Sequence, residues 1–221
     1  MSEGQKEKTF TEQMSLFRDA GYACLYLISK EEKVAEEELL KALRKHPKTG
    51  RILRFSVASA LQEITNDGKL KMVNEECTDP DEVLGTLVSI LGVPGEDDDT
   101  TNVIILPDFA EYLRRDAITR RRFRERVWWC RNVGHQMIMI GTSRQEIPDI
   151  ENDITVFQHG LPSKETTEEL LTSMSDQYEV SINPEKIERC VESLSGMTSV
   201  AQEDAISMSI VSTGKSGLVA I

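Results

Sequence analysis

The stretch Thr101-Asn102-Val103-Ile104-Ile105-Leu106-Pro107-Asp108-Phe109 decides the fold of this chain. Its apolar run, 103–106, follows an acidic loop at 96–99 and ends just before Pro107 and Asp108. A short, uniformly apolar run between turn residues predicts a strand buried on both faces, as in a parallel sheet. An aspartate at the carboxyl end of such a strand lies where α/β proteins place their ligand sites. A plain core strand followed by a solvated aspartate has the same pattern.

The composition is that of a globular protein of ordinary core size. The 221 residues are 39% hydrophobic and 29% charged, which fits one large domain, or a medium domain with a small one. The net charge of −12 argues against nucleic acid as the main partner, because binding phosphates requires clustered cations. The N-terminus is polar, and no apolar run reaches the roughly 18 residues of a membrane helix. We therefore expect a soluble, cytoplasmic protein with no membrane contact.

Cysteine and histidine usage predicts no metal site. The four cysteines are far apart, with no pair at the spacing of metal ligands, which favours reduced thiols in the cytosol. The three histidines form no metal-type constellation either. These residues are Cys24, Cys77, Cys130, Cys190, His46, His135 and His159.

Strand patterns and helix patterns alternate along most of the chain. Besides 103–106 we predict buried strands at 22–28 and 135–143, a more polar strand near a sheet edge at 51–57, and a short strand at 154–157. Helical patterns lie at 11–20, 29–46, 79–91 and 117–133, and 58–64 is expected to add a helical turn. Ser29 and Glu32 have the spacing of a capping box. The alternation predicts a five-stranded parallel sheet with helices on both faces, an α/β fold.

The sequence also suggests where the domains begin and end. Residues 1–10 are polar and are expected to be disordered, and 11–160 form the α/β domain. Residues 161–214 have helical patterns at 165–174, 184–194 and 200–211 and no strand pattern, which predicts a small helical domain. Residues 215–221 are expected to form a tail.

The order of these elements resembles the AAA+ module. The strand 103–106 with Asp108 occupies the position of the Walker B strand, whose aspartate holds Mg²⁺ in phosphate-loop enzymes. The strand at 137–143 resembles the sensor-1 strand, with Thr142 or Ser143 at the sensor position. The stretch 154–162, which ends in Leu161-Pro162, resembles the junction where the last strand enters a helical lid. The resemblance covers about 15–214 and implies a three-layer sheet with a C-terminal lid.

One subgroup of AAA proteins resembles this chain more specifically. In plastid and cyanobacterial AAA proteins with two modules, a degenerate AAA-like module precedes an active ATPase module. Those chains are similar in the opening Leu-Tyr-Leu-Ile-Ser-x-Glu-Glu, here at 25–32, in Asp-Phe after the third strand and in Leu-Pro before the lid. The resemblance implies a truncated or solitary first module, whose active module would begin soon after Ile221.

Two parts of an ATPase site are absent from the sequence. The phosphate-loop position holds Ser29, Lys30, Glu31, Glu32 and Lys33 and has no glycine, although glycines let backbone N–H groups approach phosphates. Two glutamates there repel phosphate, and the two lysines offset them only in part. Phe109 stands where Walker B has its catalytic glutamate. We therefore predict no catalytic residue, no metal site and no ATP hydrolysis by this chain.

A second glycine-lysine pair near the C-terminus is a weak candidate for a phosphate loop. Gly214-Lys215-Ser216 looks like the end of a Walker A motif, but Ser209 stands where the first glycine is required. The preceding residues have a helical pattern rather than that of a strand. We expect a frayed terminus instead.

A concentrated cationic segment stands out against the negative net charge. Three interpretations remain open for it: a solvated helix face partly neutralised by Asp116 and Glu125, a subunit interface, and nucleic-acid contact. For the interface, the acidic loop 96–99 is a complementary partner. Trp128 and Trp129 are adjacent and cannot both face one core from a helix. The arginines are Arg114, Arg115, Arg120, Arg121, Arg122, Arg124 and Arg126.

We therefore expect a catalytically degenerate AAA-like module that acts as a scaffold, a regulatory part or an oligomerisation part. Its expected partners are an active AAA module, in the same or another chain, or copies of itself. One alternative is an atypical nucleotide-binding ATPase, which would need ATP and Mg²⁺ as cofactors. Another is a clamp-loader-like adaptor that touches nucleic acid through the arginine segment.

Overall fold

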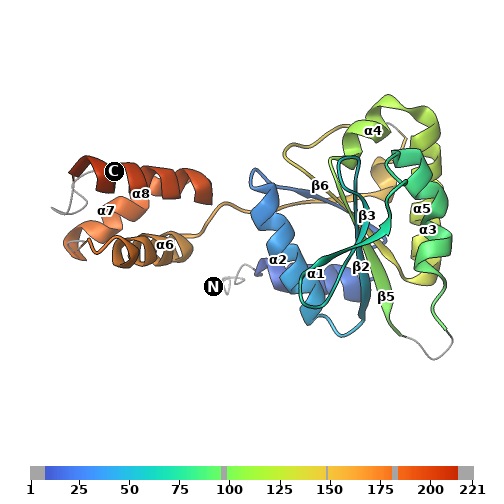
Figure 1. Cartoon of the computed structure of the whole chain (residues 1–221), viewed down its shortest axis with the longest axis horizontal. Helices are drawn as coiled ribbons and strands as arrows, with labels where there is room; N and C mark the ends of the chain where they lie inside the picture. Colours follow the sequence, from blue (N-terminus) through green and yellow to red (C-terminus); the bar gives the residue numbers. More distant parts are fainter. Residues whose placement is uncertain (1–7, 96–98, 148, 181–183, 214–221) are drawn as a thin grey trace, which may run out of the picture. The chain divides into compact units, whose positions relative to one another are not determined.

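The computed structural model describes residues 8–95, 99–147, 149–180 and 184–213. The chain divides into two compact units, Met1–His159 and Gly160–Ile221, and each is described by itself (Figure 1). Unit 1 is an α/β domain, and unit 2 is helical.

Unit 1 is built on a seven-stranded sheet in the order β4-β3-β2-β5-β6-β1-β7. The strands β2, β5, β6, β1 and β7 are parallel to one another, whereas β3 pairs antiparallel with β2 and with β4. Their bounds are β1 Cys24–Ile28, β2 Thr49–Ser56, β3 Ala60–Ile64, β4 Leu70–Asn74, β5 Thr101–Pro107, β6 Gln136–Gly141 and β7 Thr155–Gln158.

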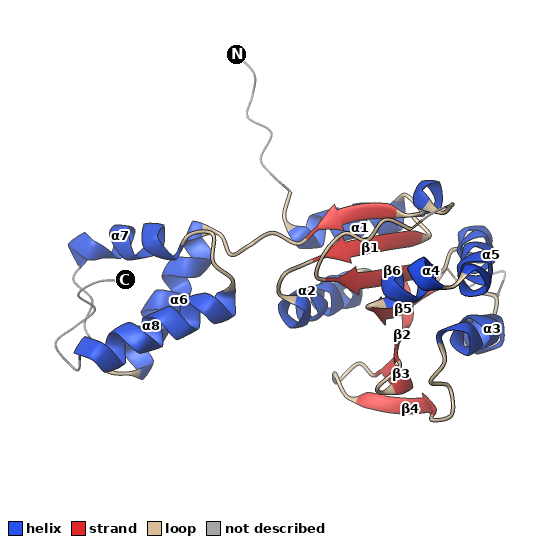
Figure 2. Ribbon diagram, turned by 90° about the horizontal axis from the view of Figure 1, so that it is seen from above, coloured by secondary structure: helices blue, strands red, loops and turns tan. Residues whose placement is uncertain are grey.

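Helices cover both faces of this sheet. The helices α1 (Phe10–Asp19) and α2 (Glu32–Lys45) pack on one face. The helices α3 (Pro80–Leu91), α4 (Phe109–Arg115) and α5 (Ala117–Val133) pack on the other (Figure 2). Alternate residues of β5 belong to two hydrophobic cores, one on each face of the sheet. Val103 and Ile105 pack with α1 and α2, and Ile104 and Leu106 pack with α3, α4 and α5. The uniformly apolar run of the sequence is therefore explained by burial on both faces.

The predicted α/β architecture is confirmed, and the predicted number of strands is wrong. The expected helical turn at 58–64 is instead strand β3, and β4 follows it. The chain reverses at Ser56–Ser59, where the N–H of Ser59 donates to the carbonyl of Ser56 (3.2 Å), and again at Gly68, whose φ is 85°. The resulting hairpin of β3 and β4 pairs with β2 and extends the sheet beyond it. The strand β2 is therefore the last of the parallel strands but does not lie at the edge of the whole sheet.

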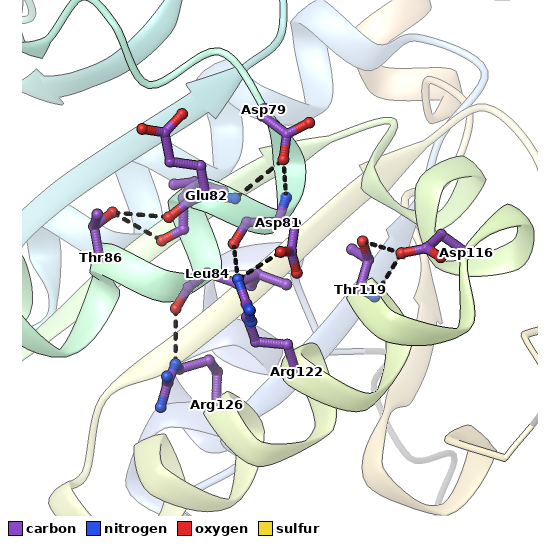
Figure 3. Close-up of polar contacts among 10 residues, drawn as sticks. Asp79, Asp81, Glu82, Leu84, Thr86, Asp116, Thr119, Arg122 and Arg126 are labelled. Atoms are coloured by element: carbon purple, nitrogen blue, oxygen red, sulfur yellow. Dashed lines mark hydrogen bonds and ion pairs between the residues drawn. The ribbon is translucent and has the colours of Figure 1, made fainter.

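Side-chain caps fix where several helices begin. The capping box expected at Ser29 and Glu32 is not formed, because α2 is preceded by Glu31 and has no side-chain cap bond. A capping box instead joins Thr9 and Glu12 at the start of α1, which begins at the last residue of the segment expected to be disordered. The helices predicted at 79–91 and 117–133 are confirmed. Asp79 and Asp116 cap α3 and α5 (Figure 3).

Unit 2 consists of α6 (Lys164–Gln177), α7 (Pro184–Leu194) and α8 (Ser199–Thr213), so the three predicted C-terminal helices are confirmed. Their core includes Leu171, Leu194 and Ile206, which are fully buried. The amide Nε2 of Gln202 donates to the hydroxyl of Thr167 at 3.1 Å and lies near the carbonyl of Leu194 at 3.2 Å. These buried contacts tie the three helices together.

In the part of the chain that the structure describes, no helix combines the length and apolar character needed to cross a membrane. All four cysteines are buried and free.

Candidate functional site

The sheet topology brings the carboxyl ends of β1, β6 and β5 together at one edge of the sheet, the position where α/β folds have their ligand crevice. The helix after β1 covers one face of the sheet, and the helices after β5 cover the other, so the chain leaves these two strands, which flank β6, in opposite directions. Ligands bind at such switch points in open α/β sheets. Backbone bonds hold the strand ends together: the N–H of Asp108 donates to Ile140 (2.8 Å), and the N–H of Ser29 donates to Gly141 (3.0 Å). The fold therefore brings Ser29, Asp108 and Thr142 to one edge.

Asp108 and Phe109, which follow one another at the end of β5, have opposite exposure to solvent. Asp108 is exposed, has a left-handed backbone (φ 53°, ψ 13°) and makes no side-chain cap bond to α4. Phe109 is 0% exposed and stacks on Phe123, with a distance of 5.8 Å between ring centroids. Its ring also meets Phe55 and Tyr112 edge to face. The position after Asp108 therefore belongs to the core and not to the crevice.

The turn between β1 and α2 is closed by a hydrogen-bond chain. Ser29, which is 2% exposed, accepts at its Oγ from the N–H of Glu31 (3.0 Å). Its Oγ also lies 3.3 Å from Nδ1 of His159, whose Nε2 lies 3.2 Å from Glu38. Because a carboxylate only accepts, Nε2 of His159 is the donor in its contact with Glu38, and the Ser29 hydroxyl lies at the other ring nitrogen. Lys30 and Lys33 are exposed on the outside of this turn.

Sequence reasoning missed His159 and Glu38. His159 is 130 residues from Ser29 and 121 from Glu38, so no local spacing connects them. Only the pairing of β7 with β1, which continues in a bond from the N–H of His159 to the carbonyl of Ile28 (2.8 Å), brings them together.

The crevice has a negative electrostatic character. Burial raises the pKa of the Glu32 carboxyl, and the nearby charges of Asp108 and Glu36 raise it further, while Arg54 acts in the opposite direction. Arg54 is held by Glu36 through a bond of 2.6 Å. The pKa of Tyr26 is likewise raised, by burial first and then by Glu111 and Asp108. A field of this sign disfavours the approach of phosphate.

The end of β6 is arranged around Tyr26. Its hydroxyl donates to the carbonyl of Ser143 at 2.9 Å, and its ring crosses Gly141, where an added Cβ would lie 2.9 Å from that hydroxyl. Thr142 and Ser143 are exposed, as a sensor position requires, and their sensor role stays a prediction. The cavity lined by Tyr26 and its neighbours has a volume of about 30 Å³. This space holds a water molecule but no nucleotide.

A larger cleft of about 900 Å³ lies elsewhere, near the amino ends of β2 and β5. It is lined in part by Arg44, Arg51 and Glu63. Nε and Nη2 of Arg51 donate to the two carboxylate oxygens of Glu63, at 3.1 and 3.0 Å. This cleft is at the opposite end of the strands from Asp108, so it does not extend the crevice. Within the described ranges, no group of three or more His, Cys, Asp or Glu side chains is arranged to hold a metal ion.

Four of the seven arginines in the cationic segment bond to groups outside their own helix. Arg122 donates to the carbonyl of Asp81 (3.1 Å) and to its carboxylate, and Arg126 donates to the carbonyl of Leu84 (2.7 Å). Figure 3 shows both side chains reaching from α5 to α3. Arg124 pairs with Asp153 (2.9 Å), in the 3-10 turn Glu151–Asp153. Arg120 donates to the carbonyl of Leu113 (2.7 Å).

The other three arginines, Arg114, Arg115 and Arg121, remain exposed. They pair with the nearby helix residues Glu111 and Glu125. The two tryptophans point in different directions, as predicted. Trp129 packs against the core, whereas Trp128 is exposed and lies under the guanidinium groups of Arg121 and Arg124. The candidate motif Gly214-Lys215-Ser216 lies outside the described residues.

Three solved structures share this fold at low sequence identity. A chain of the E. coli MS115-1 HORMA:CdnC:Trip13 complex is 13% identical, with a TM-score of 0.57 over 93% of this chain and 73% of that one. The FIGL-1 AAA domain in complex with ADP is 13% identical, with a TM-score of 0.51 over 88% and 63%. The replication initiator DnaA bound to AMPPCP and single-stranded DNA is 9% identical, with a TM-score of 0.52 over 96% and 63%. The chain thus spans between 63% and 73% of their lengths.

No curated protein matches the chain. A family model does: residues 10–159, which are nearly all of unit 1, match the N-terminal domain of SpoVK-like AAA ATPases. The predicted resemblance to the AAA+ superfamily is confirmed by this match and by the shared fold. The chain belongs to the family of SpoVK-like AAA ATPase N-terminal domains.

Proposed function

We propose that this chain is a nucleotide-independent scaffold module of an AAA ATPase. It works beside an active AAA module, in the same longer protein or in a partner chain, and it assembles through protein contacts. It does not hydrolyse ATP by itself. The single observation that carries the proposal is the turn between β1 and α2, where an AAA ATPase would cradle phosphate.

The Ser29 hydroxyl in that turn is already bonded to the backbone of the turn and to His159. A phosphate loop needs backbone N–H groups that are free to approach the ligand, and glycines that allow it. Here residues 29–35 contain no glycine, and the Ser29 hydroxyl accepts the N–H of Glu31. Burial and the charges of Asp108 and Glu36 raise the pKa of Glu32, which supports negative surroundings that disfavour a polyphosphate.

The end of β5 supports the same proposal. A hydrolytic carboxylate must reach the attacking water, but Phe109 is directed into the aromatic cluster. Within the described residues, Asp108 belongs to no group of three or more side chains that could hold a metal ion, and Mg²⁺ normally gains substrate phosphates as further ligands.

The two alternatives have less support. Nucleic-acid contact through α5 would draw on arginines of which four are engaged with α3, α4 or Asp153. An atypical nucleotide site would have to form in a turn that the side chains of Ser29 and His159 close. The four free, buried cysteines fit a reducing compartment, and we propose the cytoplasm.

The test is a titration of the purified chain with ATP and with ADP in the presence of Mg²⁺. Calorimetric heat and the fluorescence of Trp128 and Trp129 are followed together, with a phosphate-loop ATPase as the positive control. We expect no saturable signal in the micromolar range. The variant Lys30→Glu/Lys33→Glu serves as the internal control. Micromolar binding by the wild type that this variant loses would show that the turn holds phosphate, and the scaffold proposal would then be abandoned.

A further inference from the structure

Unit 1 exposes a stripe of side chains along the outer side of α5. Ile118, Arg121, Glu125 and Trp128 follow one another at spacings of three and four residues, which places them on one side of the helix. All four are exposed, and the stripe has a large apolar side chain at each end: Ile118 is 68% exposed and Trp128 is 38% exposed. The opposite side of α5 is buried in the core of unit 1.

Three exposed arginines lie at the beginning of this stripe and at the end of α4. The side chains of Arg114, Arg115 and Arg121 are 51%, 72% and 60% exposed, and they pair with glutamates of their own helices. Exposed pairs of this kind contribute little to stability, so exchanging them for a partner's carboxylates costs little. We use the name α5 docking face for Arg114, Arg115, Ile118, Arg121 and Trp128.

The local charge of this region is opposite to that of the whole chain. Residues 109–128 contain seven arginines and only three carboxylates, whereas the chain has a net charge of −12. Exposed large apolar side chains among arginines are typical of protein interfaces. The composition of the face therefore fits a partner that is acidic and partly apolar.

Trp128 is held in place by unit 1 itself. Its Nε1 donates to Asp153 at 3.1 Å, and the guanidinium carbons of Arg121 and Arg124 lie 5.4 and 5.1 Å from the centroid of its ring. A side chain fixed in this way loses little further freedom on binding. The face thus presents a preorganised aromatic ring with cations beside it, and tryptophan and arginine are the residues that most often dominate binding energy.

We propose that the α5 docking face binds an acidic amphipathic helix of another protein. The inference rests on the proposed scaffold function and deepens it, because it names the class of partner and the surface that holds it. Carboxylates of the partner helix pair with Arg114, Arg115 and Arg121, and its apolar side chains contact Ile118 and Trp128. From Ile118 to Trp128 the helix α5 rises by about 15 Å, so about three turns of the partner cover the face.

Two other partners fit this face less well. Nucleic acid would bring a long row of phosphates to a chain whose net charge is −12, and the exposed Ile118 offers phosphates no contact. A second copy of the chain would bring the same negative charge, so that the surfaces around the contact would repel. A short acidic helix carries its charge only where it meets the arginines.

Fluorescence anisotropy of a dye-labelled synthetic peptide measures this binding to the whole chain. The probe is a helical peptide of about 14 residues, with leucine at the first and fourth positions of each heptad and glutamate or alanine elsewhere. We expect a Kd of about 10–100 μM. Binding should weaken between about 50 mM and about 500 mM salt, since exposed charges are screened. The matched peptide with glutamine in place of glutamate should bind at least about tenfold more weakly.

Variants of the chain locate the binding. Arg115→Glu/Arg121→Glu should weaken it by about tenfold or more, and Ile118→Ser by about fivefold. The matched control Lys41→Glu/Lys45→Glu makes the same change of net charge with two exposed lysines of α2, on the other face of the sheet, and should stay within about twofold of the wild type. Circular dichroism and thermal unfolding confirm that each variant is folded.

Four results would overturn the proposal. The first two are no binding of the acidic peptide up to about 1 mM, and equal binding of the glutamine peptide. The third is a labelled single-stranded oligonucleotide that binds more tightly than the peptide and loses its binding in Arg115→Glu/Arg121→Glu, which would make nucleic acid the partner. The fourth is self-association in sedimentation velocity that the same variant abolishes, which would make the face a contact between copies. The nucleotide titration does not depend on these arginines, so the scaffold function and the docking face fail separately.

Discussion

Asp108 and Phe109 are neighbours in the chain, yet one is exposed at the end of β5 and the other, the first residue of α4, is fully buried against α5 and β2. The left-handed backbone of Asp108 sharply redirects the chain between them. The phenylalanine is thus a core residue with ring contacts to Phe55, Tyr112 and Phe123. Phe109, at the position where the sequence predicted the catalytic glutamate of an AAA ATPase to be missing, therefore has a structural role.

Restoring a glutamate at this position should unfold the domain rather than restore activity. We expect Phe109→Glu to lower the free energy of unfolding by more than about 4 kcal/mol, because it buries a charge and removes an aromatic ring. Urea unfolding measures the loss, and phosphate release from ATP should stay at background. The control Phe109→Leu keeps the site apolar and should cost about 1–3 kcal/mol. A stable Phe109→Glu chain would mean that the side chain can leave the core.

Arg122 should contribute more to stability than Arg121, although the two are adjacent on α5. Arg122 bonds the carbonyl and the carboxylate of Asp81 on α3, whereas Arg121 pairs with Glu125 one turn away and lies over the exposed ring of Trp128 on the same helix. We expect Arg122→Ala to cost about 1–2 kcal/mol and Arg121→Ala less than about 0.5 kcal/mol in urea unfolding. Arg122→Lys should fall between them, because it keeps the charge but not the Nη1 group that makes both contacts with Asp81. Equal effects of the two alanine variants would contradict the structural role of Arg122.

His135 should make the stability of unit 1 depend on pH in the weakly acidic range. Its Nδ1 accepts the N–H of Asn102 (3.1 Å), so the proton is on Nε2, 3.0 Å from the carbonyl of Gly92. Burial lowers the pKa of this imidazole below its ordinary value of 6.5, and Arg18 lowers it further. As the pH falls below about 6.5, the unfolded chain gains a proton that the folded chain does not bind, so the free energy of unfolding falls.

The measurement is urea unfolding at about pH 7.5 and about pH 5.5. The wild type should lose stability between these values, and His135→Gln, which cannot be protonated there, should lose less. Only the difference between the two chains is attributed to His135, since the carboxylates titrate in both. An identical pH dependence of the two chains would exclude this histidine as the cause.

Gly141 should tolerate no side chain while Tyr26 is present. A Cβ at this glycine would lie 2.9 Å from the Tyr26 hydroxyl and 3.2 Å from Cε2 of the ring. We expect Gly141→Ala to cost about 1–3 kcal/mol through overpacking. Tyr26→Phe removes the nearer atom and loses one hydrogen bond to Ser143, at a cost of about 0.5–1.5 kcal/mol. The double variant should be more stable than the sum of the two costs predicts, and strict additivity would rule out the clash.

The sequence by itself determined which segments form the layers of unit 1. The strands at 24–28, 101–107 and 136–141 were predicted because residues buried on both faces must all be apolar. The helix α5 was predicted at its observed bounds, and in the structure Asp116 caps its start and Gly134, at φ 82°, ends it. The missing glycine after β1 was equally visible, since a phosphate loop is a local arrangement of backbone groups.

Only the tertiary structure decided the rest, because the contacts involved join residues far apart in the chain. The hairpin β3–β4 was missed, since its short, polar strands are stabilised by pairing with β2 rather than by their own pattern. The sequence could not show which arginines bind within unit 1 and which remain exposed. Arg122 pairs with Asp81, 41 residues away in the chain, and Arg124 pairs with Asp153, 29 residues away. The closure of the β1–α2 turn by His159 and Glu38 depends on where the last strand of the sheet pairs. Short stretches of sequence determine local propensity and the pattern of burial. Contacts between residues far apart in the chain form only once the sheet has formed.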